Sequence, residues 1–181
     1  MQDNDIQPLW DPDDKPGSLK AYAEWLHREA VRVFRKDKTH CQILFLFKDA
    51  GLVSVNPVPA NTAADALTAG VRQAVLENGL YGVILIAEAW TYLPKRAKDH
   101  TAVQIMYGEM NEANLKDEDR AEALMLRMES RDGGHLTWLD PIIRTGDDVT
   151  LSGFKMSRRN AAPNGPLVLS DLDCVMSAIA V

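Results

Sequence analysis

The sequence predicts a single α+β domain with a mainly antiparallel sheet of about six strands and about three to four helices packed chiefly on one face. Two observations support this fold class. The run Val83–Ile86 is continuously apolar, with Asn78-Gly79 before it and Pro94 after it, as is typical of a strand buried on both faces. Segments joined by short turns also outnumber long crossovers, and short turns join antiparallel strands. The stretch Leu80–Leu93 is therefore the expected central strand.

The chain is expected to begin with an acidic arm and a helix. Residues 1–17 contain five aspartates and one large aromatic side chain, Trp10. We expect Trp10 to bind the arm to its own domain or to a neighbouring molecule. Ser18 is a favoured N-cap for a helix from Leu19 to about Lys36, where apolar residues recur at helical spacing. The domain itself would then span residues 18–181.

A hairpin and a second helix are expected next. Cys41–Lys48 and Leu52–Val58 are rich in β-branched and aromatic residues and are separated by a short turn with Asp and Gly. Asn61 or Thr62 is expected as the N-cap of a helix that runs to about Asn78, because these residue types accept a bond from the first helical turn. The glycine after this helix is a natural stop.

Residues 95–120 are expected to form a variable loop or insertion, with a short helix around residues 102–112. A segment of this length without a clear element is unusual in a compact domain and is often functional. Met and aromatic side chains are enriched at binding surfaces, so this segment is either an interaction patch or a lid over the sheet edge. The candidate surface consists of Lys95, Arg96, Met106, Tyr107 and Met110, together with Trp10.

The last part of the chain is expected to complete the sheet and to add a closing helix. Gly-rich turns separate three apolar or alternating segments, which are expected as strands. A loop rich in Asn, Pro and Gly, a short strand and a helix capped by Ser170 follow. The expected ranges are Ala121–Glu129, Leu136–Arg144 and Val149–Met156 for the strands, Ser157–Pro166 for the loop, and Leu167–Leu169 for the short strand.

Glu88 is the strongest single candidate for chemistry. It lies late in the central strand, where a desolvated carboxylate would have a raised pKa and could act as a general acid or base. The alternative is a structural ion pair with Arg127 or Arg144 across the sheet. Asp147 and Asp148 could bind Mg²⁺ with Glu88 or Asp140, since Mg²⁺ prefers oxygen ligands, but paired aspartates after Gly are more often turn residues.

Other catalytic and cofactor motifs are missing from the sequence. The four histidines lack metal-ligand spacing, and structural or solvent roles are expected for them, with His27 on the wet face of the first helix. The sequence has no nucleophile elbow, phosphate-binding loop or dinucleotide fingerprint. Cys41 and Cys174 are expected as buried free thiols, as in a reducing cytoplasm. No cofactor is therefore expected.

Charge and hydropathy limit the expected partners. The formal net charge of -6 disfavours nucleic-acid binding, which depends mainly on Lys and Arg contacts with phosphate. The sequence has no targeting segment and no apolar run of the length that a membrane helix requires, so no membrane association is expected. The expected partner is therefore another protein or a second copy of the chain, and the alternative is a small-molecule ligand.

Three short motifs resemble a group of uncharacterised bacterial and bacteriophage proteins. The motifs are Ala87-Glu88-Ala89-Trp90 at the end of an apolar strand, Asp119–Leu124 entering a strand, and Pro141–Arg144. The resemblance spans Tyr81 to Arg144. It implies a phage or prophage origin and no particular activity. The resemblance favours a small accessory, virion-associated or host-interacting protein, located in the cytoplasm of a bacterial or infected cell or in the virion.

The main hypothesis is therefore a non-enzymatic protein-binding or assembly module. One alternative is a small Mg²⁺-dependent hydrolase or nuclease-like enzyme that uses Glu88. The other is a protein that binds a small ligand or nucleotide under the middle loop.

Overall fold

The computed structural model describes residues 18–48, 51–60, 62–92, 120–131, 134–152 and 155–160. Several expectations lie outside the described residues: the acidic arm 1–17, the loop 95–119 with its short helix, the strand 167–169 and the closing helix.

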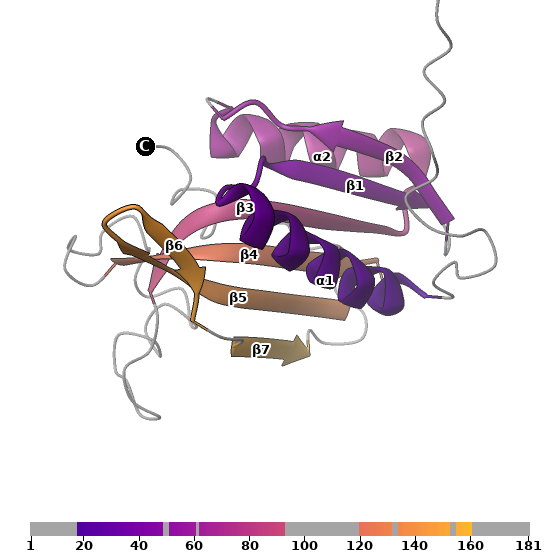
Figure 1. Cartoon of the computed structure of the whole chain (residues 1–181). Helices are drawn as coiled ribbons and strands as arrows, with labels where there is room; N and C mark the ends of the chain where they lie inside the picture. The colour runs from indigo at the N-terminus through magenta and orange to yellow at the C-terminus, as the bar shows by residue number, and fades with distance from the viewer. Residues whose placement is uncertain are drawn as a thin grey trace, which may run out of the picture.

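The described residues form an α+β fold (Figure 1). Two helices and seven strands account for nearly all of them. In chain order these are α1 (Leu19–Asp37), β1 (Ile43–Lys48), β2 (Gly51–Pro57), α2 (Ala64–Asn78), β3 (Gly82–Tyr92), β4 (Arg120–Ser130), β5 (Gly134–Thr145), β6 (Asp148–Leu151) and β7 (Lys155–Asn160).

The strands form one antiparallel sheet in which six strands follow the order β2-β1-β3-β4-β5-β6. The seventh strand, β7, pairs with β5 off this path and is also antiparallel. The predicted antiparallel sheet is confirmed, and β3 is a central strand as expected. Every residue from Val83 to Ala87 is buried, which confirms that both faces of β3 are covered.

The predicted strand Val149–Met156 is wrong, because two strands occupy this region. β6 ends at Leu151, and β7 begins at Lys155 and extends into the segment that was expected to be a loop. The cause lies in the partner strand β5, which is long and changes partner along its length: residues 134–139 pair with β7 and residues 142–145 with β6. Pro141 lies at the change of partner, where a missing N–H costs no ladder bond.

The two described helices cover opposite faces of the sheet, which corrects the expectation that helices pack chiefly on one face. Figure 1 shows α1 in front of the sheet and α2 behind it. Alternate strand residues such as Ile84 and Ile86 pack with α1, whereas Val83 and Leu85 pack with Val71 and Val75 of α2. Because successive side chains of a strand point to opposite faces, a strand that is apolar at every position needs cover on both.

Local chemistry sets the start of α1 and the end of α2, but not the start of α2. The Ser18 hydroxyl accepts a hydrogen bond from the N–H of Ala21 at 3.2 Å, which confirms the predicted N-cap of α1. Gly79 ends α2 with φ of 62°, as predicted. The N-cap of α2 is Ala63 without a side-chain bond, so the expected cap at Asn61 or Thr62 is wrong. Thr62 instead donates its N–H to the Pro59 carbonyl in a turn that precedes the helix.

Candidate functional site

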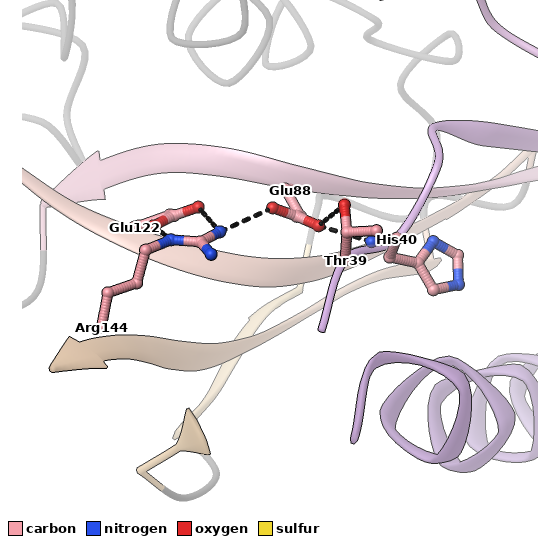
Figure 2. Close-up of polar contacts among 5 residues, drawn as sticks. All are labelled: Thr39, His40, Glu88, Glu122 and Arg144. Carbon is pink, nitrogen blue, oxygen red and sulfur yellow. Dashed lines mark hydrogen bonds and ion pairs between the residues drawn. The ribbon is translucent and has the colours of Figure 1, made fainter. Parts of the chain in front are cut away.

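Glu88 belongs to a polar cluster on the α1 face of the sheet. Ile84 and Ile86 point toward α1, so Glu88, two residues further along β3, lies on the same face. The same alternation on β4 places Glu122 on this face, since Leu124 packs in the α1 core. Arg144 near the end of β5 completes the cluster (Figure 2).

Arg144 joins the two carboxylates. Its Nε and Nη2 donate to the two oxygens of Glu122 at 2.7 and 2.5 Å, which is the bidentate geometry that planar guanidinium favours. Its Nη2 also contacts Oε2 of Glu88 at 3.3 Å. Figure 2 shows the guanidinium between Glu122 and Glu88. The three side chains thus link β3, β4 and β5 across one face.

The other oxygen of Glu88 holds the segment that connects α1 to β1. Oε1 accepts a hydrogen bond from the Thr39 hydroxyl at 2.9 Å and one from the His40 backbone N–H at 2.5 Å. Both oxygens of Glu88 therefore have partners (Figure 2). This arrangement positions a chain segment against the sheet.

The electrostatics of the cluster favour ionised groups. The hydrogen bond from Arg144 holds the pKa of Glu122 below its ordinary value of 4.5, against the opposing effect of burial. The bond to Glu122 in turn raises the pKa of Arg144. A carboxyl with a lowered pKa is ionised at neutral pH, so Glu122 is unsuited to act as a general acid.

Glu88 pairs with Arg144, one of the two arginines that the sequence suggested as its structural partner. Arg127, the other expected partner, points to the opposite face and contacts Glu129 on its own strand, with Nη2 2.6 Å from Oε1. Both side chains of this second pair are buried. The catalytic interpretation of Glu88 stays a prediction.

Asp147 and Asp148 lie exposed at the turn between β5 and β6, where Gly146 has φ of 60°. Within the described ranges, no group of three or more His, Cys, Asp or Glu side chains is placed to hold a metal ion. Asp140, the other suggested ligand, contacts a histidine instead. The magnesium site stays a prediction.

The remaining candidate residues have different outcomes. Cys41 is exposed, which corrects its expected burial, because β1 begins only at Ile43 and Cys41 lies in the connection before it. The expected interaction surface lies outside the described residues. It comprises Trp10, Lys95, Arg96, Met106, Tyr107 and Met110.

The sequence does not indicate the contacts that His27 makes. Its Nε2 lies 2.5 Å from Oδ2 of Asp140, and its ring stacks on Trp138 with centroids 5.4 Å apart. The expected place on the wet face of α1 is wrong, since the His27 side chain is only 15% exposed and that of Asp140 only 7%. Trp138 and Asp140 alternate on β5 and so share a face. Nothing local in the sequence assigns that face to His27.

A groove lies beside this pair, between α1 and β5. Its volume is about 560 Å³, and it is open to solvent. The groove is lined by Glu24, His27, Arg28, Val31, Arg35, Trp138 and Asp140. A second cavity beneath α2 has a volume of about 10 Å³, which leaves room for one water molecule at most. Of these two cavities, the groove between α1 and β5 is the one with the volume of a binding site.

The fold and its polar clusters define an α+β protein with an antiparallel sheet, covered by a helix on each face. A family model described as bacteriophage lambda protein ea47 matches residues 6–169. Because this match covers most of the sequence, the chain belongs to the bacteriophage lambda ea47 family. The resemblance to phage proteins is thereby confirmed. No curated protein and no solved structure matches the chain significantly. Neither described helix is long and apolar enough to cross a membrane.

Proposed function

We propose that this chain is a non-enzymatic assembly module, and that it joins a second copy of itself by pairing their β2 strands. β2 is the first strand of the sheet, and within the described part of the chain only β1 pairs with it. The outer row of N–H and C=O groups on such an edge is a template for another strand. This open edge is the observation that carries the proposal.

The composition of β2 supports the same proposal. Its sequence, Gly-Leu-Val-Ser-Val-Asn-Pro, contains no charged residue, although charges are a common protection against edge pairing. Val53 is 55% exposed and Val55 is 42% exposed. Val55 lies in regular register opposite Phe45 and presents a β-branched side chain to an incoming strand, whereas Val53 lies at a register shift of the strand pair.

A second copy is the occupant that we propose, because every molecule presents the same edge. Antiparallel pairing of two β2 strands around a two-fold axis is self-complementary and closes at a dimer. The hydrolase alternative has less support, since both oxygens of Glu88 bind groups of the chain itself.

Native mass spectrometry and light scattering on the full chain test this proposal. We expect a dimer at tens of micromolar, and a monomer for Val55→Lys, because a lysine on the edge repels its symmetry mate and must be desolvated. Leu76→Lys is the matched control: Leu76 is an exposed apolar residue of α2, 83% exposed, and the variant should remain a dimer.

A wild-type chain that is monomeric throughout this range would overturn the proposal. Dimers of equal stability in wild type and Val55→Lys would also overturn it, since the contact would then lie elsewhere. Loss of the dimer in both lysine variants would have the same meaning, because the effect would be general and unrelated to the edge.

A further inference from the structure

We infer that the groove between α1 and β5 binds an extended acidic peptide segment of a partner protein. Three observations support this inference: two arginines on the rim that have no ion-pair partner among the described residues, a fixed floor, and a lining of both charge signs. The groove lies over β5, whereas β2 begins the sheet at the other end. The inference therefore concerns a second surface and does not depend on the proposed dimer.

The rim of the groove carries two exposed arginines. Arg28 and Arg35 are exposed, and neither has an ion-pair partner among the described residues. Arg32, on the same helix, is instead held by Glu29 at 2.6 Å. Arg28 and Arg35 are seven residues apart on α1, which corresponds to about 10 Å along the helix axis. Val31 lies between them and supplies an apolar contact.

The floor of the groove is held in place before any ligand binds. His27 is fixed by Asp140 at 2.5 Å and by stacking on Trp138. Asp140 and Trp138 are buried, so the floor is part of the core on the α1 face. A site that does not need to reorganise loses less free energy on binding.

The dimensions of the groove suit a peptide. From Glu24 to Arg35 the groove follows α1 over about 16 Å. An extended chain rises about 3.3 Å per residue, so about five residues span this length. The two arginines then match acidic side chains two or four residues apart, because such residues of an extended chain share a face and flexible arginine side chains can reach either spacing.

The charge distribution favours a peptide over a nucleic acid. Glu24, whose side chain is 48% exposed, lines the same groove as the arginines. A nucleic acid carries a negative charge on every phosphate and would bring several charges close to this carboxylate. A peptide with only two acidic side chains also has backbone N–H groups that can donate to it. Trp138 is 4% exposed and stacked on His27, so its ring offers no open face for a nucleobase.

The test is an array of synthetic eight-residue peptides that each carry two aspartates in an Ala-Ser background, with matched asparagine peptides. The full-length labelled protein should be retained best by aspartate pairs two or four residues apart, which share one side of an extended peptide. Fluorescence anisotropy with the best peptide should then show an affinity about fivefold or more lower for the double variant Arg28→Gln, Arg35→Gln. Arg32→Gln is the matched control and should bind as wild type, because Arg32 does not line the groove.

Three outcomes would overturn the inference. The first is equal retention of aspartate and asparagine peptides. The second is equal binding of the peptide by wild type and the double variant. The circular dichroism spectra of the two proteins must match, so that a folding defect is excluded. The third is stronger competition by an oligothymidylate than by the unlabelled peptide, which would indicate a polyanion site. Val55→Lys should bind the peptide as wild type, and the double variant should dimerise as wild type, so failure of either proposal can be recognised separately.

Discussion

The contacts of Glu88 give its carboxylate a structural role. Its two oxygens contact the Thr39 hydroxyl, the His40 N–H and Arg144, which come from two distant parts of the chain. Removal of the carboxylate in Glu88→Ala leaves a backbone donor and a guanidinium without this acceptor. We expect the free energy of unfolding to fall by about 1 kcal/mol, a value kept small because Arg144 is 44% exposed to screening solvent.

Urea unfolding measures this loss, and Glu29→Ala is its control. Glu29 also pairs with an arginine, but on the exposed surface of α1, where such pairs contribute about 0.5 kcal/mol or less. A Glu88→Ala variant as stable as Glu29→Ala would show that the contacts of Glu88 contribute little. If wild type showed enzymatic turnover and a stably folded Glu88→Gln variant did not, Glu88 would be catalytic.

Glu122 makes the stability of the protein depend on pH. Arg144 lowers the pKa of Glu122 in the folded state below its ordinary value of 4.5. The corresponding stabilisation is present in full above that value and is lost as the pH falls through the lower, folded-state pKa. We therefore expect the difference in unfolding free energy between wild type and Arg144→Gln to be largest at neutral pH. The difference should shrink below about pH 4.5.

Chemical denaturation at a series of pH values checks this expectation. If the difference in unfolding free energy between wild type and Arg144→Gln stayed constant from neutral pH to about pH 3, the expectation would be contradicted. Arg32→Gln should give a smaller difference throughout, since Arg32 pairs with an exposed carboxylate.

At the scale of elements, α1 approaches the sheet closely at Gly82. A Cβ at this position would overlap the Leu19 side chain and would lie 3.1 Å from the backbone oxygen of Glu129. Leu19 is buried at the start of α1, so Gly82 lets the helix dock on β3. We expect Gly82→Ala to destabilise the fold by about 1–3 kcal/mol through overpacking.

Gly70→Ala is the matched control for this substitution. Gly70 lies within α2 and a Cβ there would meet nothing within 4 Å. Alanine has the higher helix propensity, so this variant should gain up to about 1 kcal/mol. Thermal and urea unfolding of both variants give the comparison. If both variants had the same stability, α1 would not be held closely at Gly82.

Most elements were predictable because their causes are local. Ser18 caps α1, Gly79 ends α2, and the apolar alternation of β4 identifies it as a strand. The prediction of strands was wrong where pairing with a distant strand decides the bounds of an element. β6 and β7 separate because β5 changes partner near Pro141, and that change depends on the register of β5.

At the scale of the whole molecule, the proposed dimer couples folding to concentration. If two β2 strands pair, the folded dimer is favoured by mass action, so the thermal midpoint should rise with protein concentration. Differential scanning calorimetry over a hundredfold range should show this rise for wild type and Leu76→Lys. Val55→Lys should have a midpoint that is independent of concentration. A concentration-independent midpoint for wild type would argue against a dimer that is stabilised on folding.

The candidate sites were predictable only in part. Glu88 and its structural partner Arg144 could be named from the sequence, since both lie late in strands that belong to one sheet. The bonds from Thr39 and His40 could not, because they depend on where the segment after α1 crosses the sheet. The His27–Asp140 pair needed both the rotation of α1 and the register of β5.

The sequence alone determined the α+β class, the antiparallel sheet, the central strand and the ends of α1. These follow from hydrophobic periodicity and end-capping groups, whose physical basis lies within a few residues. Only the tertiary structure decided that the two described helices cover opposite faces, that β5 has two outer partners, and that His27 meets Asp140 beside a groove. These features depend on register and helix rotation, which are set by the packing of residues far apart in the chain.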